Sequence, residues 1–341
     1  MPEYTKKGTK IATIVFVLLV VIFACIFVCR NKTSKIHINA LILPKFEIDE
    51  LTGDCPGEAQ LFYEHYFSDP TVIEIKGCDV PIYVEGDKAL MVIGEGKVSA
   101  AANLSALLAD GRFNFDNAYI YSVGCCGSPT QDTVMGDVFI ITSAIDGDLG
   151  HTADFRDMMS DDDATTWFYD AEFGPYSYYR LDEELVDKCY ELARHARIET
   201  TERTRQHMRK AFNNADWAVR DPMLIKGSTI SSDNYWKGIY SEANAKLMNS
   251  VYDCPEPFVS TEMEDVAIAR VAKNYNMLDH LVCIRASVDM DVFTPGTSPE
   301  SLWGGEAPTL IADDESETSD IFETAMYNLF NVSSAIIDNL Q

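Results

Sequence analysis

The chain has 341 residues, with 27 Lys or Arg against 54 Asp or Glu, and a formal net charge of −27 at pH 7. Contacts to nucleic-acid phosphates need a concentration of basic side chains, so this balance argues against a DNA- or RNA-binding protein. The length is sufficient for one large domain with a sizeable hydrophobic core.

The first predicted element is an apolar run over residues 11–29, which carries no charged side chain. A run of about 20 apolar residues can span the hydrocarbon core of a bilayer as a helix. A cleaved signal peptide usually has a shorter core and a small-residue cleavage site, whereas this run ends in Ile26-Phe27-Val28. We therefore predict a single-pass signal anchor over 11–29, between a short tail (1–10) and a juxtamembrane linker (30–36). Secretion after signal cleavage is the alternative.

The orientation of this anchor does not follow from charge, because basic residues flank the run on both sides. Three glycosylation sequons, at Asn31, Asn103 and Asn331, favour a main domain that faces a lumen or the exterior. In such a compartment, cysteines in polar or turn-like contexts could form disulfides. Four cysteines have such contexts: Cys55, Cys78, Cys189 and Cys254.

From residue 37 onward, predicted strands alternate with predicted helices, which is typical of a mainly parallel or mixed sheet covered on both faces. The predicted strands are 37–43, 80–84, 89–93, 118–123, 137–142, 224–230 and 280–286. The predicted helices are 58–66, 97–108, 182–195, 202–213, 241–251, 263–273 and 321–339. We predict one α/β domain over 37–341, with a long binding loop or lid over 146–177 and an acidic connection over 313–320.

Two of these strands run into glycine-rich turns. Gly94-Glu95-Gly96 leads into an alanine-rich helix, where the backbone can approach a ligand and the helix N-terminus can hold an anion or hydroxyl. Gly124-Cys125-Cys126-Gly127 ends another strand. Adjacent cysteines have neither zinc-ribbon nor redox-pair spacing, so we predict no metal site there. Cys125 has no basic neighbour in sequence to activate its thiol, which favours a pocket-lining role.

Two aromatic residues, Tyr235 and Trp236, follow Ser232-Asp233 just before a predicted helix. A planar ligand ring stacks well on a flat side chain, although aromatic residues at a helix start more often serve packing.

The most informative segment is 260–289. Thr261 and Glu264 fit a capping box at the start of a helix, and Asp289 follows the next strand. In sheets of this class, ligands bind beyond the carboxyl ends of the strands, so Glu264 and Asp289 are candidates for one site. A structural interpretation stays open, because Glu in a first helical turn favours the macrodipole and Asp is an ordinary turn residue.

In this order, these segments resemble the nucleoside phosphorylase and nucleosidase superfamily over roughly residues 40–339. Within it, Lys226-Gly227, Gly238 and Pro295-Gly296 are similar to the purine nucleoside permease family. The resemblance implies a three-layer α/β/α fold of the phosphorylase/hydrolase type with a central mixed sheet, a purine nucleoside as ligand, and a homo-oligomer. The family is named for transport, although its domain resembles enzymes that act on glycosidic bonds. Cleavage of the N-glycosidic bond is therefore our leading prediction, and transport or binding without turnover is the alternative.

The resemblance also implies roles for individual residues. Glu264 would accept hydrogen bonds from the ribose hydroxyls, and Met263 would pack under the ribose. Asp289 would protonate the leaving purine, and Asp291 is a rival candidate for this acid. The same resemblance implies a lining for the sugar and base made of Thr261, Glu262, Tyr235, Trp236, Gly94, Gly96, Cys125 and Gly127.

The attacking group is less well marked in the sequence. Phosphorylases of this type hold phosphate with arginines, but this chain has Ser122 and Lys45 at the corresponding positions, and lysine lacks the bidentate fork. The nucleosidase branch has a water-activating carboxylate in the first loop, and Glu47 is its counterpart. Water is therefore preferred to phosphate, which is the alternative co-substrate, and no cofactor is expected.

Overall fold

The computed structural model describes residues 35–150, 177–293 and 315–340, which divide into two units. In the smaller unit, the described strands are β1 (Ile36–His37) and β6 (Phe113–Asn114), which pair in parallel. The larger unit comprises Ile38–Asp110 and the chain from Phe115 onward, and it contains the other described elements. The predicted strand 37–43 is thus divided, and its second part is β2 (Ala40–Leu43).

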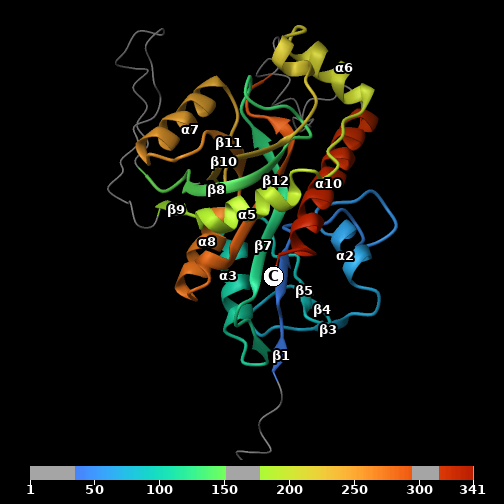
Figure 1. The fold of residues 1–341 in the computed structure, drawn as a ribbon, viewed down its shortest axis with the longest axis vertical. Helices are drawn as coiled ribbons and strands as arrows, with labels where there is room; N and C mark the ends of the chain where they lie inside the picture. Colours follow the sequence, from blue (N-terminus) through green and yellow to red (C-terminus); the bar gives the residue numbers. More distant parts are fainter. Residues whose placement is uncertain (1–34, 151–176, 294–314, 341) are drawn as a thin grey trace, which may run out of the picture. The chain divides into compact units, whose positions relative to one another are not determined.

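A ten-stranded mixed sheet forms the centre of the larger unit (Figure 1). Along the sheet the order is β11 (Phe258–Glu262), β10 (Leu224–Ser231), β8 (Val138–Asp146), β12 (Leu281–Met290), β7 (Tyr119–Ser128), β2, β5 (Lys88–Leu90), β4 (Ile82–Glu85) and β3 (Thr71–Ile73), with β9 (Tyr178–Arg180) paired to β8. The ten strand pairings are half parallel and half antiparallel. The antiparallel pairs are β12–β8, β8–β9, β11–β7, β3–β4 and β4–β5. The predicted α/β fold with a central mixed sheet is confirmed.

One end of this sheet closes into a ring. β11 returns to β7 through a bridge between Thr261 and Gly127, which joins β7, β12, β8, β10 and β11 in a circle. Every residue of β12 is buried, so neither face of this strand meets solvent. The register of β12 against β7 shifts between Ser287 and Asp289, which marks a bulge near the carboxyl end of β12.

The helices lie close to their predicted positions. They are α2 (Gln60–Tyr66), α3 (Gly96–Leu108), α5 (Glu183–Ala193), α6 (Glu202–Ala211), α7 (Ile239–Val251), α8 (Asp265–Asn274) and α10 (Glu315–Ile337). Helix α10 packs against β12 and β7, while α8 contacts α3 and the strands β8 and β10. Because α10 already begins at Glu315, most of the predicted acidic connection is helical.

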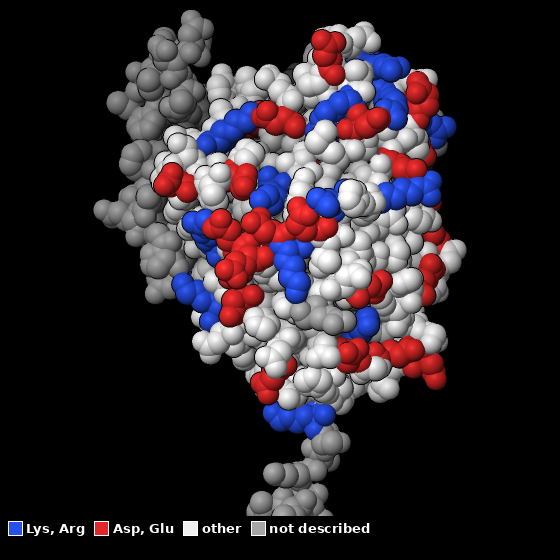
Figure 2. All heavy atoms as spheres, viewed as in Figure 1, with Lys and Arg blue, Asp and Glu red and all other residues white. Residues whose placement is uncertain are grey.

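Helix α5 shows why the acidic composition is compatible with a large core. Its buried side chains include Leu185, Val186 and Cys189, whereas Glu183 and Asp187 are exposed on the opposite side. Figure 2 shows acidic side chains gathered where Figure 1 places α5, with basic side chains interspersed around them. The negative charge on this face is therefore solvated surface.

The largest departure from prediction is at the start of α8. The predicted capping box is wrong, because Thr261 belongs to strand β11 and Glu264 is the N-cap without a side-chain cap bond. Glu262 takes over the capping, since its Oε2 accepts from the backbone N–H groups of Glu264 at 2.7 Å and Asp265 at 2.8 Å. Pairing with β10 and the bridge to β7 keeps Thr261 extended.

Three predictions concern the membrane and the compartment. Among the described residues, no helix has the length and apolar character needed to cross a bilayer. The predicted anchor over 11–29 lies outside these residues, as do Asn31 and residues 151–176 of the predicted loop 146–177. The Asn103 side chain is buried and donates to the Ile93 carbonyl at 2.9 Å, so this sequon is closed in the folded protein. Cys78, Cys189 and Cys254, which by their sequence context could form disulfides, are free thiols in the structure.

Candidate active site

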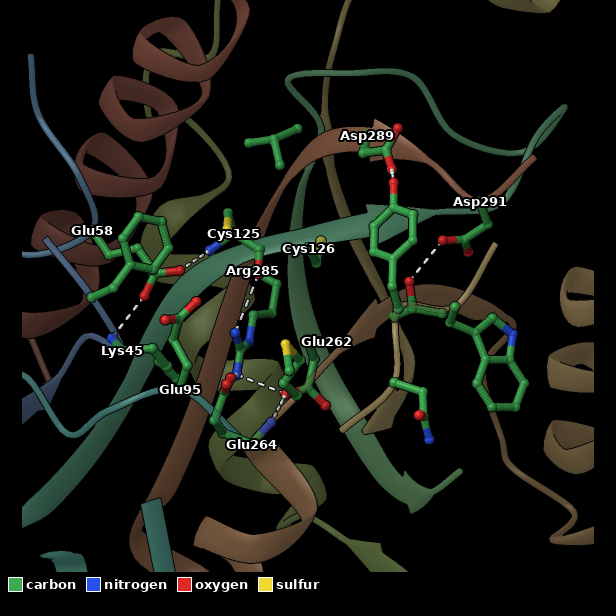
Figure 3. Close-up of a pocket in the computed structure, with 18 residues that line it drawn as sticks. Lys45, Glu58, Glu95, Cys125, Cys126, Glu262, Glu264, Arg285, Asp289 and Asp291 are labelled. Atoms are coloured by element: carbon green, nitrogen blue, oxygen red, sulfur yellow. Dashed lines mark hydrogen bonds and ion pairs between the residues drawn. The ribbon is translucent and has the colours of Figure 1, made fainter. Parts of the chain in front are cut away.

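A cavity of about 180 Å³ lies at the carboxyl ends of β2, β7, β10, β11 and β12 (Figure 3). Its lining comes from the segments that follow or end these strands, together with residues just before α2, α3 and α8. This is the edge at which sheets of this class place their ligands, as the sequence predicts. Glu264, Met263, Thr261 and Tyr235 all line the cavity.

Arg285, on β12, organises the floor of this cavity and is 1% exposed. Its guanidinium holds Asp265 with two bonds, Nε to Oδ2 at 3.0 Å and Nη2 to Oδ1 at 2.7 Å. The same Nη2 lies 2.8 Å from Glu262 Oε2 and 3.3 Å from Glu264 Oε2. Three buried carboxyl groups thus share one cation, and the cluster keeps an excess of acidic groups.

This sharing affects the three acids differently. Burial raises the pKa of Glu262 to about 7, and the neighbouring Asp265 carboxylate adds to the rise against the opposing effect of Arg285. Burial also acts to raise the pKa of Asp265, but the Arg285 guanidinium outweighs it and holds that pKa below its ordinary value. Burial raises the pKa of Glu264, although Arg285 and Lys45 oppose the rise.

The glycine turn before α3 donates a backbone hydrogen bond to the Glu264 carboxylate. The Gly96 backbone N–H donates to Glu264 Oε1 at 2.8 Å. Gly94 and Gly96 have φ of +91° and +82°, which side chains rarely adopt, so both positions need glycine. Gly96 thus holds the carboxylate that faces the cavity, while the predicted lining residues Gly94 and Gly96 are not themselves among the residues that line it.

Lys45 is buried beside this cluster, and its ammonium group is fully used. Its Nζ donates to Leu43 O at 3.0 Å, to Ser122 Oγ at 2.7 Å and to Val123 O at 2.9 Å. Ser122 Oγ in turn donates to Asp265 Oδ1 at 2.6 Å. Burial lowers the pKa of Lys45, and repulsion by Arg285 adds to this. Lys45 therefore braces two strands and has no N–H left for a phosphate group.

The structure places Glu47 away from the cavity lining. Its carboxylate caps the amino end of α2, where it accepts from the N–H groups of Ala59 at 2.9 Å and Gln60 at 2.5 Å, and also from Gly57. Glu58 is the carboxylate of this loop that lines the cavity, and it is 2% exposed. It accepts from Cys125 N and Lys45 N, each at 2.7 Å (Figure 3). Sequence reasoning assigned Glu58 to the start of a helix and gave it no role.

Cys125 and its neighbours on β7 form one wall. Burial raises the pKa of the Cys125 thiol well above its ordinary value, and the Glu58 carboxylate raises it further, so the thiol is a poor nucleophile. Its carbonyl accepts from Arg285 Nη1 at 3.2 Å.

The two predicted aromatic residues lie in different surroundings. Trp236 is 8% exposed and packs against Ile145 and Ile230, with its indole N–H donating to the Ser241 carbonyl at 2.8 Å. Packing is therefore its main role, although it also borders the cavity. Tyr235 is 59% exposed at the cavity, and its hydroxyl donates to Asp289.

Two aspartates complete the site at the end of β12. The Asp289 carboxylate pairs with Lys237 Nζ at 2.7 and 2.8 Å, a cation that sequence reasoning did not assign. Asp291 instead accepts from Thr261 Oγ1 at 2.7 Å, and both aspartates line the cavity. Lys237 directly follows Tyr235-Trp236 in the sequence, and this position beside the predicted aromatic pair could have indicated a role for it in the site.

Replacing Gly127 with alanine should lower the free energy of unfolding by about 1–3 kcal/mol, which is typical of overpacking. An added Cβ would lie 2.5 Å from Asp291 Oδ1 and 2.6 Å from Thr261 Oγ1. Urea unfolding followed by circular dichroism measures the change. Gly111→Ala is the matched control, because its added Cβ meets nothing within 4 Å. Equal effects of the two substitutions would contradict the crowded geometry.

Similar sequences include two proteins named as purine nucleoside permeases. A probable purine nucleoside permease of Schizosaccharomyces pombe is 25% identical over 267 residues, covering 73% of this chain and 74% of that protein. A purine nucleoside permease of Candida albicans is 24% identical over 192 residues, and the match spans 52% of this chain and 47%, or about half, of that protein.

Solved structures with the same fold include two 5′-methylthioadenosine/S-adenosylhomocysteine nucleosidases. The enzyme from Neisseria meningitidis is 15% identical with a TM-score of 0.54, covering 88% of this chain and 98% of that chain. The enzyme from Helicobacter pylori is 14% identical with a TM-score of 0.55, covering 90% and 100%. At so low a sequence identity, the structural likeness to these two enzymes shows a shared fold alone. The sequence model described as "Purine nucleoside permease (NUP)" matches residues 37–341, which contain every described element of the larger unit, so the chain belongs to the purine nucleoside permease family.

Proposed function

We propose that this protein binds purine nucleosides and cleaves their N-glycosidic bond by hydrolysis. The observation that carries the proposal is the predominance of acidic side chains in the cavity, where Lys45 and Arg285 are the basic lining residues among those described. The acidic side chains that line it are Glu58, Glu95, Glu262, Glu264, Asp289 and Asp291. Breaking the bond from sugar to purine develops positive charge on the sugar, and a buried negative field stabilises that charge.

The family and the fold support the same class of ligand. The relatives in S. pombe and C. albicans are named for purine nucleosides, and the nucleosidase from N. meningitidis was solved with methylthio-immucillin-A. In the proposed complex, Glu264 accepts hydrogen bonds from the ribose hydroxyls and Met263 packs against the sugar. The purine then lies toward Tyr235 and the aspartates at the end of β12.

Water is the proposed nucleophile because the cavity offers no free cation to phosphate among the described lining residues. All three N–H groups of the Lys45 ammonium donate to protein acceptors, and the Arg285 guanidinium forms ion pairs with buried carboxylates. A phosphate ion would also be repelled by the acidic lining. Glu58 is the proposed general base, since each of its oxygens accepts one backbone bond and keeps a lone pair for a water molecule.

A base-release assay tests this function. The purified protein is incubated with inosine, guanosine or adenosine, with and without inorganic phosphate, and free base and free ribose are measured by chromatography. We expect release of base and ribose at a rate that phosphate does not change. Release only with phosphate, together with ribose 1-phosphate, would assign phosphorolysis. No release from any of the three nucleosides between pH 5 and 9 would refute cleavage.

The name of the relatives favours a second candidate, nucleoside binding in the service of transport. A single hydrophobic helix cannot enclose a polar path across a bilayer, so transport would need an oligomer or a partner channel. The predicted anchor over 11–29 would place the domain at a membrane, facing the lumen or the exterior. Nucleoside binding without turnover, combined with loss of nucleoside uptake on deletion of the gene, would support this candidate over hydrolysis.

A further inference from the structure

The two aspartates at the end of β12 differ in how their oxygens are used. The Asp289 carboxylate accepts four hydrogen bonds from three donor groups: Lys237 Nζ on both oxygens, the Tyr235 hydroxyl on Oδ2, and the Met290 N–H on Oδ1 at 2.8 Å. The side chains of Lys237 and Asp289 are 7% and 6% exposed. A proton on Asp289 would leave the buried Lys237 ammonium without its counter-charge, which is costly. Asp289 therefore fits an ion-paired carboxylate that positions its neighbours.

Asp291 has the opposite surroundings. It is 1% exposed, its Oδ1 accepts from Thr261 Oγ1, and its Oδ2 has no hydrogen-bond partner among the described residues. A buried, unpaired carboxylate oxygen is unfavourable, whereas a neutral carboxylic acid has one acceptor oxygen and one O–H group. The pattern at Asp291 is therefore that of a protonated acid whose O–H is not used by the protein.

The backbone fixes this acid at the cavity. The Asp291 N–H donates to Ser128 O at 2.7 Å, and its carbonyl accepts from Gly238 N at 2.6 Å. The lack of a side chain at Gly127 leaves space for the carboxyl group, because an added Cβ would lie 2.5 Å from Asp291 Oδ1. Rotation about the Cβ–Cγ bond exchanges the two oxygens, so the O–H can turn without any movement of the chain.

We infer that Asp291, rather than Asp289, is the catalytic general acid, and that Asp289 is a positioning residue that holds Lys237 and Tyr235. This assignment rests on the proposed hydrolysis. The O–H bond of Asp291 breaks as an N–H bond forms on a ring nitrogen of the purine, and the electron pair of the glycosidic bond leaves with the purine. Water forms the new bond to the sugar carbon and gives its proton to Glu58. Exchange of protons with solvent then restores both acids.

The charges around Asp291 support its proton-holding role. Burial is the main cause that raises its pKa well above the ordinary value, and the carboxylates of Asp289 and Glu242 raise it further. The Thr261 hydroxyl and the Lys237 ammonium oppose the rise. A group that must be protonated to act loses activity as pH rises through its pKa, so Asp291 should produce the alkaline limb of the rate profile.

The test compares Asp291→Asn with Asp289→Asn in the full-length protein. Each variant is assayed on inosine and on 4-nitrophenyl β-D-ribofuranoside, whose leaving group departs without a proton. We expect Asp291→Asn to lower kcat for inosine by about 10²–10⁴-fold, to remove the alkaline limb, and to leave the nitrophenyl substrate almost unaffected. Asp289→Asn should raise KM and lower the melting temperature but keep the alkaline limb.

Other outcomes separate the inference from the proposed function. If Asp291→Asn loses activity equally on both substrates, the role of Asp291 is structural and the inference is overturned. If Asp289→Asn shows the selective loss on inosine instead, Asp289 is the acid. Binding of formycin B, a nucleoside analogue that cannot be cleaved, shows that each variant retains a folded site. A wild-type protein that binds formycin B but cleaves neither substrate refutes the proposed hydrolysis itself.

Discussion

Replacing Arg285 with methionine should lower the free energy of unfolding by about 3–5 kcal/mol, the cost of removing one partner from a buried ion cluster. The variant would leave Glu262, Glu264 and Asp265 without the guanidinium that they share. Their repulsion would also displace the carboxylate proposed to hold the ribose, so nucleoside binding should be lost. Equilibrium unfolding in urea and calorimetric titration with formycin B measure the two effects.

The matched control is Arg194→Met, which breaks an ion pair with Glu191 at 3.0 Å whose side chains are 51% and 61% exposed. Such a pair contributes about 0–1 kcal/mol. The pH dependence adds a second check through Asp265, whose pKa Arg285 holds below its ordinary value. A depressed acid pKa stabilises the fold above the unfolded pKa, near 4, and this contribution is lost as pH falls. The deficit of the Arg285 variant should therefore be largest near neutral pH, and a deficit that is the same at all pH values would contradict this account.

Replacing Glu58 with glutamine should lower kcat for hydrolysis by about 10²–10⁴-fold, because an amide cannot take the proton of the attacking water. The amide keeps one acceptor oxygen, so one of the two backbone bonds, to Cys125 or to Lys45, is also disturbed. Single-turnover base release measures the chemical step, and formycin B binding reports whether the site is intact. We expect binding to change far less than kcat.

Glu47→Gln is the control for this experiment, because Glu47 lies in the same loop but caps α2 outside the cavity lining. This variant should lose about 0.5–2 kcal/mol of stability, as expected for a cap, and keep its kcat. Loss of turnover in Glu47→Gln with turnover retained in Glu58→Gln would restore the sequence-based choice of base.

Much of the fold could be predicted because local signals and the tertiary structure agree. Helices α3, α6 and α7 and strand β10 lie within two residues of their predicted bounds. Local signals mark the helix starts, since glycine turns precede α3 and α7 and the Thr201 side chain caps α6. Strand β11 was missed because its polar Ser260, Thr261 and Glu262 do not read as a buried strand. They are buried only because partners from β7, β10 and β12 surround them.

The candidate site was predicted in part for the same reason. Glu264 and Asp289 end or follow regular elements, so their position at one edge of the sheet could be inferred. Glu58 is held at the cavity by a hydrogen bond from Cys125, 67 positions away in the sequence. The role of Arg285 depends on the three acidic side chains that surround it in the fold. Such relations depend on how distant strands meet, which a single sequence does not encode in any local pattern.

The bonds that hold the cavity together join very distant parts of the chain. Ser122 and Asp265 are 143 positions apart, and Gly96 and Glu264 are 168 apart. Contacts of this kind require large loops to close first, which slows folding. A chain growing on the ribosome cannot complete the ring of strands until β12 has been made, so the cavity forms only after Asp291 has been synthesised. The newly made protein should therefore gain its ligand-dependent stability late, after most of its helices have already been synthesised.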